Sequence, residues 1–217
     1  MQDLDIGSIL RVLPGIIFGL TVHEYAHTFV AFKLGDDTAR QAGRLTLNPL
    51  RHIDPIGFVF LLVAGFGWAK PVLIDSSKLQ HPRRDDILIS LAGPLSNLLL
   101  AILIALVLKI CLSIAPYEGG ALYRELLNVG IAGLYINIGL FVFNLIPLPP
   151  LDGSHLITSL ISMKNIASAQ KFFKYGAYAF LAIIILERVL HVNLLPINVL
   201  VDAIAQGLFN LLNLFRN

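Results

Sequence analysis

Two histidines and a glutamate stand together in an apolar part of the chain, in the run His23-Glu24-Tyr25-Ala26-His27. On a helix, residues four positions apart lie about 40° apart around the axis and one turn along it, so both imidazoles can reach one metal ion. Glu24, beside the first histidine, is placed to act on water at the metal rather than as a ligand. The pattern favours a metal-dependent hydrolase. The plainer alternative is a buried polar network or the lining of an ion path.

A third metal ligand has to come from a distant part of the chain. A catalytic zinc site has three protein ligands and keeps one position open, and no suitably placed His or Glu follows on the same segment. We expect the third ligand to be Asp152, which follows Pro147, Pro149 and Pro150, where the prolines end a helix. The alternative is that Asp152 caps the next helix, and both roles are compatible.

The composition places this chemistry in a membrane. The 217 residues are 56% hydrophobic and 14% charged, with a mean hydropathy of +0.77, whereas soluble domains are about 45–50% apolar and about 25% charged. These values exclude an ordinary soluble enzyme, a disordered tail and a fibrous protein. The net charge of +2 predicts no nucleic-acid partner, and the single cysteine, Cys111, excludes a disulfide framework.

The apolar runs predict an all-α polytopic membrane protein with about five transmembrane helices. A spanning helix needs about 20 mostly apolar residues. The expected spans are Ile9–Phe32, Ile87–Leu108, Val129–Pro147, Phe172–Leu186 and Leu194–Phe215. In the last, a polar stripe recurs every four residues, formed by Asn198, Asp202, Gln206 and Asn210. We favour a last span that packs this stripe against protein, and the alternative is a helix in the membrane interface.

The apolar segment Pro55–Trp68 is short for a span and is expected to be re-entrant. If it enters the membrane and returns, the basic residues on both sides of it share one face, as the positive-inside rule prefers. The connection 33–86 is then cytoplasmic. The same path leaves His27 and Asp152 on one face of the membrane, which three ligands of one metal require.

Two asparagines and two short runs are candidates for contacts with a substrate. Asn97, in Ala92-Gly93-Pro94-Leu95-Ser96-Asn97, and Asn144 are expected to contact a substrate strand or the reacting carbonyl. The alternative for both is helix packing. Leu45–Leu47 and Val72–Ile74 are expected to form a small β-hairpin or sheet at the cytoplasmic face, whose edge could hold an unwound peptide.

These motifs, in this order, resemble the site-2 protease family of intramembrane zinc metalloproteases. The resemblance covers residues 9 to about 156, and Gly67-Trp68-Ala69-Lys70-Pro71 is similar to a compact prokaryotic branch without a PDZ domain. It implies one Zn²⁺ per chain, held by His23, His27 and Asp152, with Glu24 as general base. It also implies that the substrate is a peptide of a membrane protein, cut in or near the lipid bilayer.

Residues 1–217 are expected to form one membrane-embedded domain, with a core over 9–156 and C-terminal helices over 157–217. The expected location is the inner membrane of a prokaryotic cell, with the active site toward the cytoplasm. Two other classes stay open at this point. A metal or proton transporter would also place His, Glu and Asp in membrane helices, and a catalytically silent scaffold would not need Glu24.

Overall fold

The computed structural model describes residues 6–64, 67–115, 120–160, 166–190 and 192–214, and most of them are helical. The elements are α1 (Ile6–Lys33), α2 (Thr38–Gln41), the 3-10 helix η1 (Pro49–Arg51), α3 (Pro55–Ala64), the 3-10 helix η2 (Ser76–Lys78), α4 (Pro82–Ile114), α5 (Ala121–Asn144), α6 (Gly153–Leu160), α7 (Ile166–Leu190) and α8 (Ile197–Leu211). Within the described ranges, α1, α4 and α5 are long and apolar enough to cross a membrane. The helical architecture is confirmed at this level, and the count of five spans stays a prediction.

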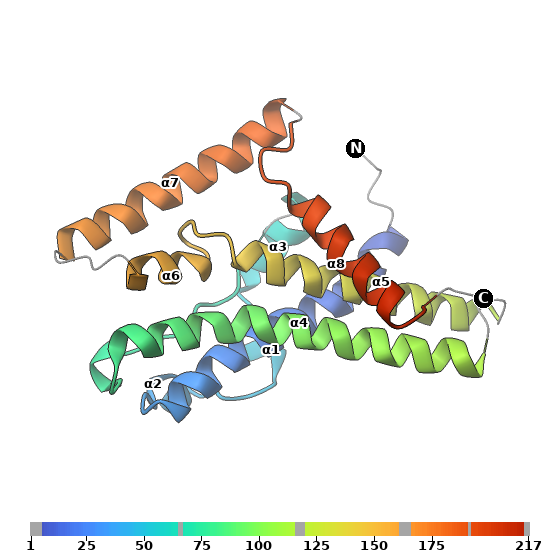
Figure 1. Cartoon of the computed structure of the whole chain (residues 1–217), viewed down its shortest axis with the longest axis horizontal. Coiled ribbons are helices and arrows are strands. Elements are labelled where there is room, and N and C mark those ends of the chain that lie inside the picture. The colour runs from blue at the N-terminus through green and yellow to red at the C-terminus, as the bar shows by residue number, and fades with distance from the viewer. Residues whose placement is uncertain (1–5, 65–66, 116–119, 161–165, 191, 215–217) are drawn as a thin grey trace.

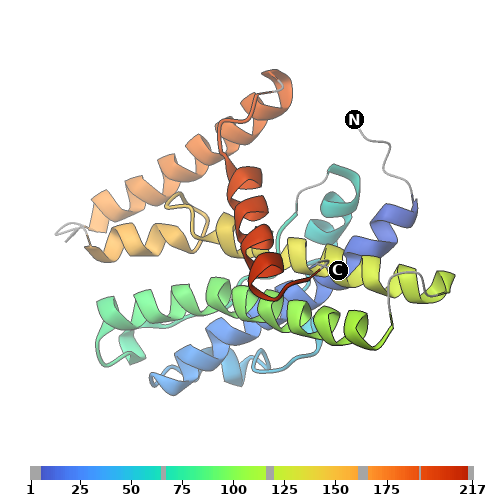
Figure 2. The ribbon, with the colours of Figure 1, turned by 45° about the vertical axis from the view of Figure 1, so that its right-hand side comes forward.

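The three long helices pack against one another as a bundle (Figures 1 and 2). α1 and α5 run in the same direction, because Arg11 near the start of α1 pairs with Glu125 near the start of α5, with Nε and Oε2 2.8 Å apart. Their backbones come close at Gly15, where an added Cβ would lie 2.7 Å from Gly133 Cα. Small residues permit this approach. His27, toward the end of α1, therefore lies at the same end of the bundle as the residues that follow α5.

The segment expected to be re-entrant turns back on itself. α3 has 10 residues, which at about 1.5 Å per residue span about half of a bilayer core. The chain then returns, and Ile53 and Ala69 form an antiparallel bridge. The Lys70 N–H donates to the His52 carbonyl at 2.7 Å. Both ends of the segment thus lie side by side, as re-entry requires. Its insertion into the bilayer stays a prediction, and residues 65–66 lie outside the described residues.

The two short strands expected over Leu45–Leu47 and Val72–Ile74 are not formed, and the described part of the chain contains no sheet. A side-chain contact instead joins the residues that come just before the two runs. The Arg44 guanidinium donates to the carbonyls of Lys70 and Pro71, and Pro71 has no N–H to offer a partner strand. The predicted β-hairpin is therefore not confirmed.

The connection after α1 is tied to the end of that helix. Lys78 Nζ pairs with Asp37 Oδ1 at 2.7 Å, and the Asp75 N–H donates to Asp36 Oδ2 at 2.7 Å. The hydrogen bond from Lys78 holds the pKa of Asp37 below its ordinary value. Because of these bonds, η2 lies at the same end of the bundle as the last turn of α1.

α8 packs on the bundle with the face opposite to the expected one. The polar stripe is exposed, at Asn198, Asp202, Gln206 and Asn210. Ala205 is fully buried and shares a core with Leu134 and Ile138 of α5. Burial of apolar side chains is favourable, whereas a buried amide needs a partner for each polar group. The prediction that the stripe packs against protein is therefore wrong.

The helix expected around Phe172–Leu186 is the longer α7. It diverges from the α1–α4–α5 bundle in both views (Figures 1 and 2). One of its contacts joins the rings of Phe180 and Phe143, whose centroids are 5.7 Å apart. α7 therefore meets the end of α5, close to the turn that carries Asp152.

Candidate metal centre

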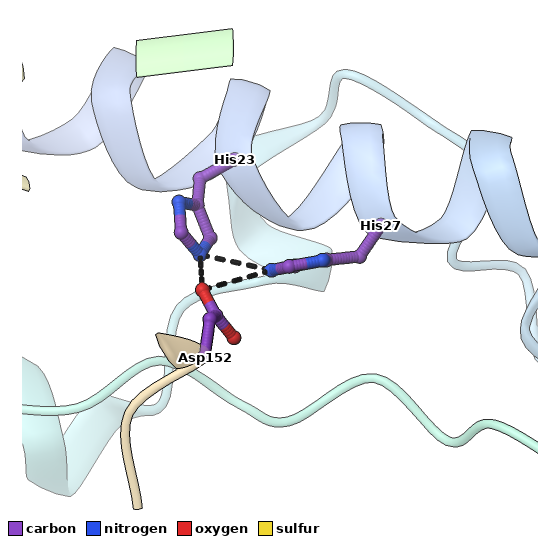
Figure 3. Close-up of side chains that lie close together, drawn as sticks. All are labelled: His23, His27 and Asp152. Carbon is purple, nitrogen blue, oxygen red and sulfur yellow. Dashed lines mark hydrogen bonds and ion pairs between the residues drawn. The ribbon is translucent and has the colours of Figure 1, made fainter. Parts of the chain in front are cut away.

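Three side chains from distant parts of the chain meet at one point (Figure 3). His23 and His27 project from one face of α1, and Asp152 comes from the turn before α6. Nε2 of His23 lies 3.0 Å from Asp152 Oδ2, and Nε2 of His27 lies 3.3 Å from the same oxygen. The two Nε2 atoms are 3.0 Å apart. The structure therefore brings together all three residues that were expected to bind a metal.

In the neutral form of each histidine, Nε2 is the ring nitrogen without a proton. His27 Nδ1 lies 2.7 Å from the Ile89 carbonyl, which can only accept, so Nδ1 is the protonated nitrogen. His23 Nδ1 lies 2.7 Å from the amide oxygen of Asn97, which likewise accepts. Both Nε2 lone pairs therefore face the triangle. Asp152 Oδ2 is buried and receives no hydrogen bond.

A divalent cation fits this arrangement. Three electron-rich atoms held 3.0–3.3 Å apart repel one another unless a positive charge lies between them. Zinc binds histidine nitrogen and carboxylate oxygen at about 2.0–2.2 Å, and a tetrahedron of that size has edges of about 3.3–3.5 Å. The observed spacing is close to such an edge. Two histidines and one carboxylate also form a donor set that zinc accepts in catalytic sites.

The turn that carries Asp152 is built by prolines and a glycine. α5 ends at Asn144, and the Leu151 N–H then donates to the Leu148 carbonyl at 2.9 Å. α6 begins directly after Asp152, at Gly153. A Cβ at Gly153 would lie 2.6 Å from the Ile146 carbonyl oxygen. Only glycine therefore lets the turn come this close to the end of α5. Asp152 holds the position before a helix, as the capping alternative expects, and also reaches the two histidines.

Two further residues shape the centre. The Glu24 side chain is buried and lies within electrostatic range of His23, His27 and Asp152. Gly93 of α4 faces the imidazoles, because a Cβ there would lie 2.6 Å from His23 Nε2. Its place against His23 and His27 depends on how α4 crosses α1, which no local pattern reveals.

Both asparagines that were proposed to contact a substrate have hydrogen-bond partners within the protein. Asn97 is fully buried and bonds to His23, to the Gly19 carbonyl and to Asn137. Asn144 donates to the Leu140 carbonyl of its own helix at 2.9 Å. Their contact with a substrate stays a prediction. Asn137, fully buried in α5, was missed by the sequence reasoning, although an amide inside a membrane span is a signal that could have found it.

The other histidines that the structure describes lie outside the triangle. His155 is half-buried, and its Nδ1 lies 3.1 Å from Asp86 Oδ2 of α4. The hydrogen bond to Asp86 raises the pKa of His155. His52 is fully buried and bonds through Nε2 to the Thr46 carbonyl at 2.7 Å. His191 lies outside the described residues.

Comparisons with known proteins agree with this geometry. The model of peptidase family M50 matches residues 112–187, which include Asp152, and no PDZ family matches the sequence. The chain is 41% identical over 170 residues to a Bacillus subtilis protein named as zinc metalloprotease YwhC, and the match covers 78% of each chain. It is 32% identical over 154 residues to Mycolicibacterium smegmatis Rip2, also named as a zinc metalloprotease, covering 68% of this chain and 56% of Rip2. To MJ0611 of Methanocaldococcus jannaschii, with the same description, it is 31% identical over 150 residues, which cover 69% of this chain and 68% of MJ0611. No solved structure matches the chain.

Proposed function

Since this chain belongs to peptidase family M50, we propose that it is a zinc-dependent intramembrane endopeptidase that cuts other membrane proteins within or near their transmembrane segments. The observation that carries the proposal is the meeting of His23, His27 and Asp152, with both Nε2 lone pairs turned toward one point. The names of the relatives support zinc as the metal and proteolysis as the reaction. Cleavage of this kind is regulated intramembrane proteolysis.

The depth of the site supports a substrate inside the membrane. His27 and His23 stand six and ten positions before Lys33, where α1 ends. At about 1.5 Å per residue they lie about 9 and 15 Å from the end of a membrane-length helix. A bilayer core is about 30 Å thick, so a substrate has to reach a level well inside it. Lipid surrounds the site, and the peptide partner is a segment of another membrane protein.

We assign the chemical steps to four side chains. When bound, one zinc ion per chain supplies a Lewis acid that polarises a peptide carbonyl and makes a water molecule acidic. His23, His27 and Asp152 would hold the ion as its three protein ligands. Glu24 accepts a proton from water as general base and then gives it to the leaving amine of the cut peptide. The proton count balances, because the second water proton stays with the new carboxyl group or leaves to solvent.

We also propose the orientation and extent of the domain. Residues 1–217 form one unit, in which a core over 9–156 carries the chemistry and the helices over 157–217 pack beside it. The metal end of the bundle faces the cytoplasm of a prokaryotic cell, and the protein lies in its inner membrane. The support is the basic character of the connection 33–86, which is tied to that end of the bundle through Lys78 and Asp37.

The test compares purified wild-type protein with Glu24→Gln in lipid vesicles. We expect both to contain zinc by metal analysis, because Glu24 is not a ligand. Only the wild type should cut a membrane-spanning peptide, and a chelator should abolish that activity until zinc is returned. Cleavage by Glu24→Gln at the wild-type rate would refute the general-base role. Wild-type protein that holds no metal would refute the proposal as a whole.

A further inference from the structure

A chain of hydrogen bonds joins the metal centre to the middle of α5. His23 Nδ1 lies 2.7 Å from Asn97 Oδ1. Asn97 Nδ2 donates to Asn137 Oδ1 at 3.0 Å and to the Gly19 carbonyl at 3.0 Å. Asn137 Nδ2 donates to the Gly133 carbonyl at 2.8 Å. Both asparagine side chains are fully buried, so water does not compete for these bonds.

The direction of every bond in this chain follows from two backbone carbonyls. A carbonyl only accepts, so the amide group of Asn137 has to turn its Nδ2 toward Gly133. Its Oδ1 then faces Asn97. Asn97 in turn points its Nδ2 at that oxygen and at the Gly19 carbonyl. The only orientation left for Asn97 presents its oxygen to His23.

The proton on His27 Nδ1 is held without such a chain of hydrogen bonds. His27 Nδ1 donates directly to the Ile89 carbonyl, so a single backbone group decides its protonation. His23 faces a side-chain amide that could be turned either way. Turned the other way, Asn97 would donate to Nδ1, move the imidazole proton to Nε2 and remove the lone pair that a metal needs.

We propose that Asn137 is a positioning residue, which keeps His23 ready for metal by holding the Asn97 amide in one orientation. The inference rests on the proposed function, because it takes His23 as a zinc ligand. If Asn97 turned, its oxygen would face the Gly19 carbonyl and Asn137 Oδ1, and two favourable bonds would become two contacts between acceptors. Partners of metal-bound histidines typically change metal affinity about 10–100-fold when they are removed.

The packing around Asn137 holds this oxygen in place. A Cβ added to Gly19 of α1 would lie 2.8 Å from Asn137 Oδ1. The glycine therefore lets α1 and α5 close over the amide. Helices α1, α4 and α5 each supply one member of the chain, His23, Asn97 and Asn137, so the orientation is set by the bundle and not by one helix.

The first experiment measures zinc affinity by competition with a chelator for the full-length protein in lipid. Asn137→Leu removes the acceptor at similar size, and we expect zinc to bind about 10–100-fold more weakly. Asn137→Asp, protonated in this dry position, still accepts from Asn97 and donates to Gly133, so its affinity should stay near the wild-type value. Thr21→Val is the matched control, because Thr21 is buried and, among the residues that the structure describes, its hydroxyl donates to the Ile17 carbonyl of its own helix and not to the chain of asparagines.

The second experiment reads the imidazole directly in metal-free protein. In protein labelled with ¹⁵N at its histidines, the nitrogen shifts distinguish a protonated Nδ1 from a protonated Nε2, and His23→Gln identifies the His23 signals. We expect Nδ1–H in the wild type, in Asn137→Asp and in Thr21→Val, and a rise of Nε2–H in Asn137→Leu. A role in packing alone would lower stability without moving this proton.

A double variant sharpens the test. In Asn97→Asp both terminal atoms of the side chain are oxygens, so as a carboxylate beside a metal-binding histidine it presents an acceptor to His23 in either orientation, whatever stands at position 137. Adding Asn137→Leu to that background should leave zinc affinity unchanged, whereas the two changes would add if Asn137 acted independently. Should Asn137→Leu not fold, Asn137→Ala removes the same amide without bulk and carries the same expectations.

Unchanged zinc affinity or an unchanged His23 tautomer in folded Asn137→Leu, or in Asn137→Ala, would overturn the inference. Neither readout uses cleavage. A wild type that binds zinc but cuts no peptide would therefore count against the proposed function alone. A wild type that binds no zinc would likewise count against the proposed function. The nitrogen shifts of His23 would still test the orientation of Asn97.

Discussion

Replacement of Gly93 by alanine should remove zinc from the protein while leaving its fold intact. The added Cβ would lie 2.6 Å from His23 Nε2 and closer still to His27 Nε2. Nonbonded carbon and nitrogen atoms ordinarily stay about 3.5 Å apart, so the imidazole of His23 has to retreat by about 0.9 Å and that of His27 by about 1.2 Å. A zinc–nitrogen bond is about 2.0–2.1 Å long, and a shift of this size takes at least one ring out of bonding range.

The expected loss is larger than that from an outer hydrogen-bond partner. Removal of such a partner weakens metal binding by about 10–100-fold, and displacement of a ligand should therefore cost about 100-fold or more in zinc affinity. Cleavage should fall at least as far, because a misplacement of about 1 Å near a reaction centre lowers the rate by about 100-fold by itself.

The assay is zinc affinity by chelator competition, followed by cleavage of a membrane-spanning peptide at saturating zinc. Gly139→Ala is the matched control, since a Cβ at Gly139 meets nothing within 4 Å. Alanine in place of a helical glycine is also favourable for folding by about 0.5–1 kcal/mol. Gly139→Ala should bind zinc as the wild type does. Wild-type affinity in a folded Gly93→Ala protein would refute the view that bare backbone at this position makes room for the ligands.

Three further predictions test the ligand, the pH dependence and the topology. Asp152→Asn should lose most of its zinc by metal analysis, since a neutral amide is a poor ligand, and full zinc content would mean that Asp152 only caps α6. Because the bond to Asp86 raises the pKa of His155, this pair stabilises the fold below the unfolded-state pKa of about 6.5 and loses its effect as pH rises through the raised folded-state pKa. The difference in Tm between metal-free wild type and His155→Gln should therefore shrink from about pH 5.5 to about pH 9, and a constant difference would contradict this cause. A cysteine placed by Lys78→Cys should react with a membrane-impermeant reagent only from the cytoplasmic side, and labelling from outside would overturn the proposed orientation.

Local chemistry alone was enough to indicate the metal ligands. His23 and His27 lie four positions apart in an apolar run, and that spacing aims both rings at one point on any helix. The prolines before Asp152 end a helix wherever the chain goes, because they lack an N–H. The pairing of Asp152 with the histidines followed from a topological argument, since parallel first and third long helices end on the same side.

Predictions from local sequence pattern failed where long-range packing decides the structure. The short β-branched runs near Leu45 and Val72 have strand character, but a strand exists only if a partner pairs with it. Here the Arg44 guanidinium binds the carbonyls of Lys70 and Pro71, just before the second run, and no ladder forms between the two runs. The polar stripe of α8 shows a periodicity that marks one face without saying which face is covered. The apolar side around Ala205 turned out to be the buried one.

The sequence by itself determined which side chains can hold a metal and which stretches can be membrane helices, because both depend on spacing along one element. Only the tertiary structure decided what surrounds the metal. Gly93 faces the imidazoles, and Asn137 reaches His23 through Asn97, because three helices cross at one depth. A crossing of this kind joins residues that are far apart in the chain, and no periodicity within one helix contains that information.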